Sequence, residues 1–221
     1  MATCLRRGLG AFAVADHNHL EGSLRAAELV ASAAFARFMA DHYPGRPFPR
    51  VVVAQEVNAA EGELMGMFIS RPIPRGLSLE ETALAIREQG GLVNVPHPFA
   101  RVAHRRPAVD ILTRHLSLID AVEIFNARNA VRLDDQLAWA FARRHRLGRT
   151  AGSDAHLRTE IGRGFVWIED FADAPSFLRA LRRARPGGRK TWPLFPLATW
   201  ARNARGALAD MRRQKELTGR Y

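Results

Sequence analysis

The sequence predicts an α/β protein whose sheet is mostly parallel. Short apolar runs of strand length alternate with segments of helical composition along most of the 221 residues. This alternation is typical of strand–helix–strand units with right-handed crossovers. Six or seven strands are compatible with a doubly wound sheet and with a barrel related to the (β/α)8 type.

The predicted strands are short runs rich in apolar residues. They cover residues 10–16, 50–57, 63–70, 92–97, 120–125, 149–156 and 162–170. Only a polar, glycine-containing turn separates the second run from the third, so we expect a hairpin-like excursion there. The remaining strands are expected to be parallel.

The predicted helices are recognised by apolar spacing and by end signals. The clearest covers residues 78–91, where Ser78 and Glu81 form a capping box and two glycines end the helix. Further helices are expected at residues 22–43, 107–116, 129–147 and 174–185.

The chain is expected to form one domain over residues 1–185, followed by a basic tail over residues 186–221. The length suits one ordinary globular domain with a sizeable core. The tail is predicted to be helical, with Trp192 and Trp200 anchoring it.

Composition limits the cellular context. Cys4 is the single cysteine of the sequence, so an internal disulfide is excluded and a reducing cytoplasm is expected. No segment approaches the length of a transmembrane helix, and the start lacks the features of a signal peptide. We therefore expect a cytoplasmic protein with no membrane partner.

The formal net charge is +11, and the excess is almost all arginine. Much of it lies in residues 178–190 and 201–220. An anionic partner such as a phosphorylated metabolite or nucleic acid would suit this charge. Because these stretches lack interleaved aromatic residues, a compositional bias explains them better than nucleic-acid binding, which is possible but not favoured.

Side chains that bind metal ions gather where the predicted strands end. They are Asp16, His17, Glu56, His97, Glu123, Asn126, Asp154 and His156. The carboxyl ends of parallel strands form the rim at which α/β folds bind ligands. Singly, each residue has an ordinary explanation: a helix cap, a satisfied core histidine, a salt bridge or a turn. Together they favour a site for a divalent metal ion, because independent accidents would not all fall at strand ends.

Five stretches resemble successive motifs of the PHP (polymerase and histidinol phosphatase) family of metal-dependent phosphoesterases. They are "AVADHN", "EVNAAEGELMGMF", "GGLVNVPHPF", "VEIFNAR" and "AGSDAHLRTEIGRG". The resemblance runs from about residue 8 to residue 185 and leaves the arginine-rich tail outside. It implies a distorted (β/α)7 TIM-like barrel with two or three manganese, zinc or iron ions at its carboxyl-terminal rim.

The resemblance also assigns site residues. It makes five residues metal ligands and Glu63 a further candidate; the five are His17, Glu56, His97, Asp154 and His156. Asp16, beside His17, joins the catalytic set. Arg128, and either Arg101 or His104, lie in loops from which a cation could hold the phosphate and stabilise charge in the transition state. Solvated surface charge explains each of these cations equally well.

The expected function is that of a hydrolase. A metal-dependent phosphoesterase would use metal-activated water to hydrolyse a phosphate ester of a small metabolite or nucleotide. Two alternatives stay open. One is a nuclease or nucleotide-trimming enzyme, which the basic charge favours. The other is a catalytically impaired remnant that acts as a binding domain.

The first motif of the PHP family, His-x-His on an initial strand, has no counterpart in this sequence. The chain begins in what resembles the end of the first helix. We therefore expect a barrel with a gap at the position of its first strand, and a start codon placed too far downstream in preference to a decayed gene.

Overall fold

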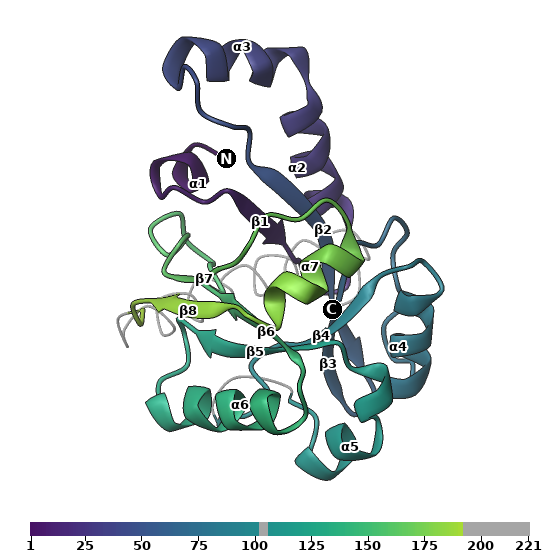
Figure 1. Ribbon diagram of the computed structural model, residues 1–221. Helices are drawn as coiled ribbons and strands as arrows, with labels where there is room; N and C mark the ends of the chain where they lie inside the picture. The colour runs from purple at the N-terminus through teal and green to yellow at the C-terminus, as the bar shows by residue number, and fades with distance from the viewer. Residues whose placement is uncertain (102–105, 192–221) are drawn as a thin grey trace, which may run out of the picture.

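Six strands form one curled sheet in this computed structural model (Figure 1). The structure describes residues 1–101 and 106–191. The strands follow the chain order across the sheet; they are β1 (Ala11–Val14), β2 (Arg50–Ala59), β3 (Gly62–Met67), β4 (Leu92–Val95), β5 (Ala121–Asn126) and β6 (Gly148–Gly152). Each strand therefore lies beside its neighbours in the sequence.

The sheet is parallel except at β3. β3 is antiparallel to both β2 and β4, and the expected hairpin-like excursion is confirmed by the pairing of Val57 with Leu64. The turn between β2 and β3 is too short for a crossover, so the second strand of the pair must reverse direction. The other described pairs, β1 with β2, β4 with β5 and β5 with β6, are parallel.

The distorted (β/α)7 barrel with a gap at its first strand, expected from the sequence, is not confirmed as such. In the described part of the chain the six-stranded sheet ends at β1 and β6, and it curls like half of a barrel. β7 (Gly164–Trp167) and β8 (Arg185–Gly188) form a separate antiparallel pair. β8 lies across the predicted domain boundary at residues 185 and 186.

The helix expected over residues 22–43 is two helices, α2 (Glu21–Ala31) and α3 (Ala33–His42). Ser32 breaks the helix with an extended backbone, and its hydroxyl accepts a hydrogen bond from Phe35 N. A serine in this geometry is a favourable N-cap, so a new helix begins there. α3 and the short helix α1 (Ala2–Arg6) enclose a small apolar cluster at the top of Figure 1.

The remaining helices cover the sheet. They are α4 (Leu79–Arg87), α5 (Val109–Arg114), α6 (Arg132–Arg144) and α7 (Ala174–Leu181), with a short 3₁₀ turn at Leu116–Leu118. The capping box of Ser78 and Glu81 begins α4 as predicted. In the described residues, no helix is both long and apolar enough to span a bilayer.

The two faces of the sheet carry different cores. Val122 and Ile124 of β5 belong to the cluster packed under α4, α5 and α6, whereas Ala121 belongs to the cluster packed against α7. Successive side chains of a strand point to opposite faces. Glu123 therefore shares the face of Ala121, where β5 approaches its carboxyl end.

The tail beyond Thr191 lies outside the described residues, together with its predicted anchors Trp192 and Trp200.

Candidate metal centre

The chain after β1 brings His17 beside Glu56. Glu56 N donates a hydrogen bond to Asp16 O at 3.2 Å, and Asn18 N donates to Glu56 O at 2.7 Å. His17 and Glu56 thus form an isolated parallel bridge beyond the end of β1. This backbone pairing with Glu56 fixes the position of the His17 main chain, from which the ring extends.

Three potential ligand atoms converge at this point. His17, Glu56 and Glu63 each offer one atom, and these atoms all lie within 4.8 Å of one another. His17 Nδ1 lies 3.9 Å from Glu63 Oε1. Two ligands held at about 2.2 Å from one ion lie at most about 4.4 Å apart. A shift of a few tenths of an ångström would therefore let all three ligate one ion.

His97 adds a fourth donor from the end of β4. Its Nε2 lies 3.1 Å from Glu56 Oε1 and 3.8 Å from Glu63 Oε2. The three side chains are buried, whereas His17 is exposed. Two imidazole nitrogens and two carboxylates are a donor set that suits a borderline divalent ion. The residues present therefore fit the metal that the resemblance implies.

The electrostatics of this cluster favour positive charge. Burial opposes the charged form of His97, but the hydrogen bond to Glu56 and the charges of Glu123, Glu56 and Asp154 outweigh it and raise the pKa of His97 to about 9. Burial raises the pKa of Glu123 to about 7, although the charge of His97 and a hydrogen bond from Asn126 act in the opposite direction. Perturbed pKa values of this kind are common at functional sites.

Glu123 and Asn126 connect this cluster to Asp154. Glu123 Oε2 accepts hydrogen bonds from His97 N at 2.8 Å and from Asn126 Nδ2 at 3.0 Å. Asn126 Nδ2 also lies 3.4 Å from Asp154 Oδ2. The carboxyl ends of β4, β5 and β6 are therefore joined by side-chain contacts at one rim.

The loop from Asp154 to Glu160 holds two predicted ligands. His156 Nδ1 lies 3.5 Å from Asp154 Oδ1, and Asp154 has a φ of 47°. Glu160 is buried and accepts hydrogen bonds from His156 N at 2.7 Å and Leu157 N at 2.9 Å. Through these two hydrogen bonds, the Glu160 carboxylate fixes the backbone of the loop that carries Asp154 and His156.

Arg128 is the charge partner of this loop. Its Nη1 lies 3.9 Å from Glu160 Oε2 and 3.5 Å from Asp154 O, and its side chain is only 9% exposed. The predictions did not include Glu160. The available signal was its place inside the stretch "AGSDAHLRTEIGRG", four residues after His156.

The other predicted site residues lie in different surroundings. The carboxylate of Asp16 lies against Gly22 in the first turn of α2, where an added Cβ would overlap it. Arg101 pairs with Asp134, with 3.2 Å between Nε and Oδ1. His104 lies outside the described residues. The roles assigned to all of these residues, and to the metal ligands, stay predictions.

A family model supports the resemblance. The model, described as PHP-associated, matches residues 133–186, which include β6, β7, α7 and the loop of Asp154 and His156. The fold and this match together define an α/β protein similar to the PHP-like metal-dependent phosphoesterases, so the resemblance seen in the sequence is confirmed.

Two proteins of one organism are similar in sequence to part of this chain. An uncharacterized protein of Methanocaldococcus jannaschii is 34% identical over 122 residues, a match that covers 55% of this chain and 61% of that protein. A second uncharacterized protein of the same organism is 31% identical over 118 residues, covering 52% of this chain and 50% of that protein. This chain thus matches only part of the length of either relative.

Two solved structures share the fold. One is a two-domain protein of Bacteroides vulgatus containing a predicted PHP-like metal-dependent phosphoesterase, with a TM-score of 0.58, 14% identity, and coverage of 84% of this chain and 58% of that one. The other is Endonuclease Q in complex with a 27-mer duplex that has an abasic lesion at the active site, with a TM-score of 0.52, 13% identity, and coverage of 87% and 54%. At these identities the likeness concerns the fold alone.

Proposed function

We propose that this chain carries a metal-dependent phosphoesterase site that hydrolyses a phosphate ester of a small metabolite or nucleotide. The observation that supports it most is the convergence of His17, Glu56, Glu63 and His97 at the carboxyl-terminal rim, with ligand atoms at distances that one ion can span. A structural salt bridge would need one carboxylate for His97, and the protein buries two beside it.

These four residues would hold the first ion, and Asp154 and His156 would serve a further one. The mixed nitrogen and oxygen donors suit manganese, zinc or iron. A bound divalent ion supplies a Lewis acid that lowers the pKa of water and binds phosphoryl oxygens. Ligation needs His97 without its proton, so its raised pKa means that the ring exchanges a proton for the metal ion.

The surrounding residues would orient the ligands. Glu123 holds the backbone of His97, and Asn126 holds the carboxyl groups of Glu123 and Asp154. Such contacts fix ligand geometry and commonly change metal affinity or activity by about 10–100-fold when they are lost. The burial of Arg128 favours a positioning role over the phosphate contact predicted from the sequence. Asp16 and His104 remain candidates for the reaction itself.

Metal content and hydrolysis of p-nitrophenyl phosphate test this function together. We expect the purified chain to bind manganese or zinc, and a chelator to abolish turnover. Glu56→Gln should lower both metal content and turnover by at least about tenfold. Glu28→Gln makes the same chemical change on the exposed surface of α2 and should match the wild type.

The outcomes separate the candidates. Metal binding without hydrolysis of any phosphate ester would leave the binding-domain alternative, and no metal binding would reject the site. A nuclease is the second enzymatic candidate, supported by the net charge of +11 and the fold shared with Endonuclease Q. It predicts cleavage of oligonucleotides that falls steeply with added salt.

A further inference from the structure

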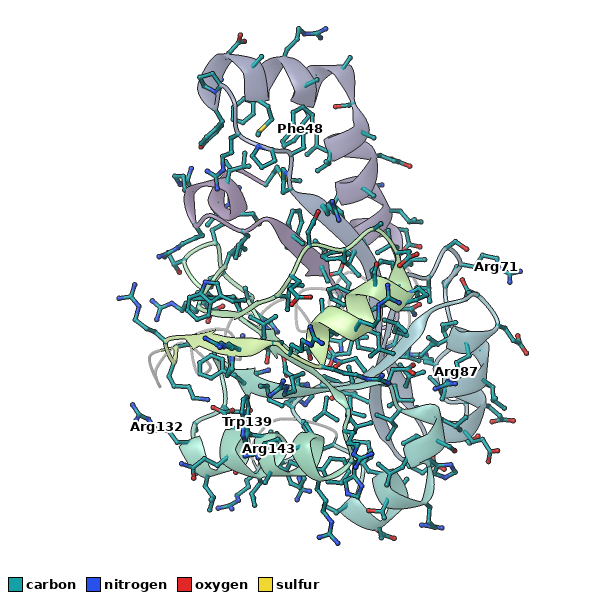
Figure 2. All side chains as sticks on the ribbon, in the orientation of Figure 1. Phe48, Arg71, Arg87, Arg132, Trp139 and Arg143 are labelled. Carbon is teal, nitrogen blue, oxygen red and sulfur yellow. The ribbon has the colours of Figure 1, made fainter. Side chains whose placement is uncertain are left out.

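A basic pocket lies next to the candidate metal centre. It has a volume of about 490 Å³ and opens between the end of β5, the first turn of α6 and the residues that follow β8. Figure 2 labels Arg132 at the end of α6 below β8. Phe125 forms part of its wall, and Arg132, Arg189 and Lys190 line it.

Among the described residues that line the pocket, the one carboxylate, that of Asp135, is already neutralised. Lys190 Nζ binds the carboxylate of Asp135, donates to Asn126 O at 2.8 Å and lies 4.6 Å from the ring centre of Phe125. Asp135 Oδ1 also accepts a hydrogen bond from Asn129 Nδ2 at 2.9 Å. Asp135 and Lys190 thus hold the loop after β5 together and contribute no net charge.

Two arginines remain. Arg132 and Arg189 are exposed at the pocket, and no carboxylate within residues 1–101 and 106–191 forms an ion pair with either. Among the described lining residues, three cations against one carboxylate leave a net charge of +2. Guanidinium groups present planar, paired donors that match phosphate oxygens. The pocket is therefore suited to a phosphate group.

Asn126 separates the pocket from the metal centre. Its side-chain amide donates to Glu123 and lies 3.4 Å from Asp154, on the metal side. Its backbone carbonyl accepts the hydrogen bond from Lys190, on the pocket side. The two sites thus share Asn126 at the same rim.

We propose that Arg132 and Arg189 bind a second phosphate group of the substrate, so that the preferred substrate carries two phosphate groups. This proposal rests on the proposed function, which places the scissile phosphate at the metal centre. The second phosphate can belong to a sugar bisphosphate or to a nucleotide chain, and the chemistry of recognition is the same for both.

The test compares ligands that differ by one phosphate. Binding of fructose 1,6-bisphosphate and fructose 6-phosphate is measured by calorimetry on the full chain, with and without manganese. Arg132→Gln combined with Arg189→Gln should weaken binding of the bisphosphate by roughly 10–100-fold, as expected for lost charged hydrogen bonds, and leave the monophosphate unchanged. Binding of a 5′-phosphorylated dinucleotide is measured in the same way. Comparing its affinity with that of the sugar bisphosphate distinguishes the two sources of phosphate.

Two further variants keep the test decisive. Arg71→Gln removes an exposed arginine on the opposite side of the molecule (Figure 2) and should bind both ligands like the wild type. Gln136→Glu adds a negative charge to the pocket wall without removing an arginine, and should also weaken the bisphosphate selectively. It replaces the double variant if that protein does not fold.

Failure of the pocket and failure of the proposed function give different results. If p-nitrophenyl phosphate is hydrolysed but the variants bind the bisphosphate like the wild type, the pocket proposal is rejected and the phosphoesterase stands. If no phosphate ester is hydrolysed and the selective loss is still found, the pocket stands and the phosphoesterase is rejected. Equal loss for both sugar phosphates also overturns the pocket, because it indicates general charge attraction.

Discussion

His97 Nε2 lies 3.1 Å from Glu56 Oε1, and both side chains are almost completely buried. Burying a charged pair costs desolvation free energy that the attraction between the partners must offset. The pKa of His97, raised to about 9, keeps a proton on the ring at neutral pH in the metal-free chain. The same two groups can therefore stabilise the empty rim as an ion pair and ligate an ion as neutral imidazole and carboxylate.

The metal-free chain should lose stability as the pH rises from 4.5 to 9, through Glu123 up to about pH 7 and through His97 between pH 6.5 and about 9. The pKa of His97 rises on folding from 6.5 to about 9, and that of Glu123 from 4.5 to about 7. Groups whose pKa is raised stabilise the fold below their unfolded pKa, and this contribution is lost as the pH passes the folded pKa. Urea unfolding with a chelator present should show that the free energy of unfolding falls by on the order of a few kcal/mol over this pH range.

His97→Asn provides the control for this pH dependence. The variant should lose most of the decline between pH 7 and 9, since the titrating ring is gone. An unchanged slope would show that other groups cause the decline.

Glu160→Ala should destabilise the protein by about 3 kcal/mol, because it leaves Arg128 buried without its charge partner. It should also weaken metal binding, since Glu160 holds the backbone of His156. Glu160→Gln can still accept the backbone hydrogen bonds and should retain more metal affinity than the alanine variant. Urea unfolding and metal competition with a chelating dye measure the two effects.

Glu169→Gln is the matched control for Glu160. Glu169 pairs with Arg183, but both side chains are largely exposed. Loss of such a pair should change stability by less than about 1 kcal/mol and leave metal binding unaffected. Equal effects of the Glu160 and Glu169 variants would contradict the role of Glu160 in holding the loop of His156.

Gly152→Ala should disturb the candidate metal centre by displacing the Glu123 side chain. A Cβ at Gly152 would overlap Glu123 Oε1, and Glu123 holds His97 N through its other oxygen. The added methyl group should cost about 1–3 kcal/mol and displace Glu123, with weaker metal binding as the result. Gly10→Ala has open space around its Cβ and should change metal affinity little. Unaltered metal affinity in Gly152→Ala would show that Glu123 does not position His97.

Ser32→Ala should destabilise the helix pair α2 and α3 by about 1 kcal/mol, because Phe35 N loses its side-chain acceptor. The metal centre should be unaffected, since α3 packs in a separate apolar cluster. Thermal unfolding and the metal titration measure the two expectations. A loss of metal affinity would show that this cluster is coupled to the rim.

Local signals predicted the elements that depend on few residues. The capping box at Ser78 and Glu81 and the hairpin of β2 and β3 need only neighbouring residues, and both are confirmed. The break at Ser32 was missed because apolar spacing continues on both sides of it. β8 was missed because Pro186, Gly187 and Gly188 have low strand propensity, and the cross-strand partners in β7 fix them.

Only part of the candidate site could likewise be predicted from the sequence. Residues at strand ends could be listed from the sequence, because polar side chains at the ends of apolar runs stand out. The ion pair of Glu160 and Arg128 could not be predicted, since it depends on how a loop brings together residues 32 positions apart. The half-barrel curl of the sheet could not be predicted either, because it depends on long-range packing and not on any single segment.

The order of the strands has a consequence for synthesis on the ribosome. Each strand from β2 to β6 pairs with the one made just before it, so the sheet can grow from one edge as the chain emerges. His17, Glu56, Glu63 and His97 all precede residue 98, and the last of them stands at the end of β4. A nascent chain that has folded to this point already has the four donors proposed for the first ion. Asp154 and His156 follow β6, so the residues proposed for a further ion join the site only later in translation.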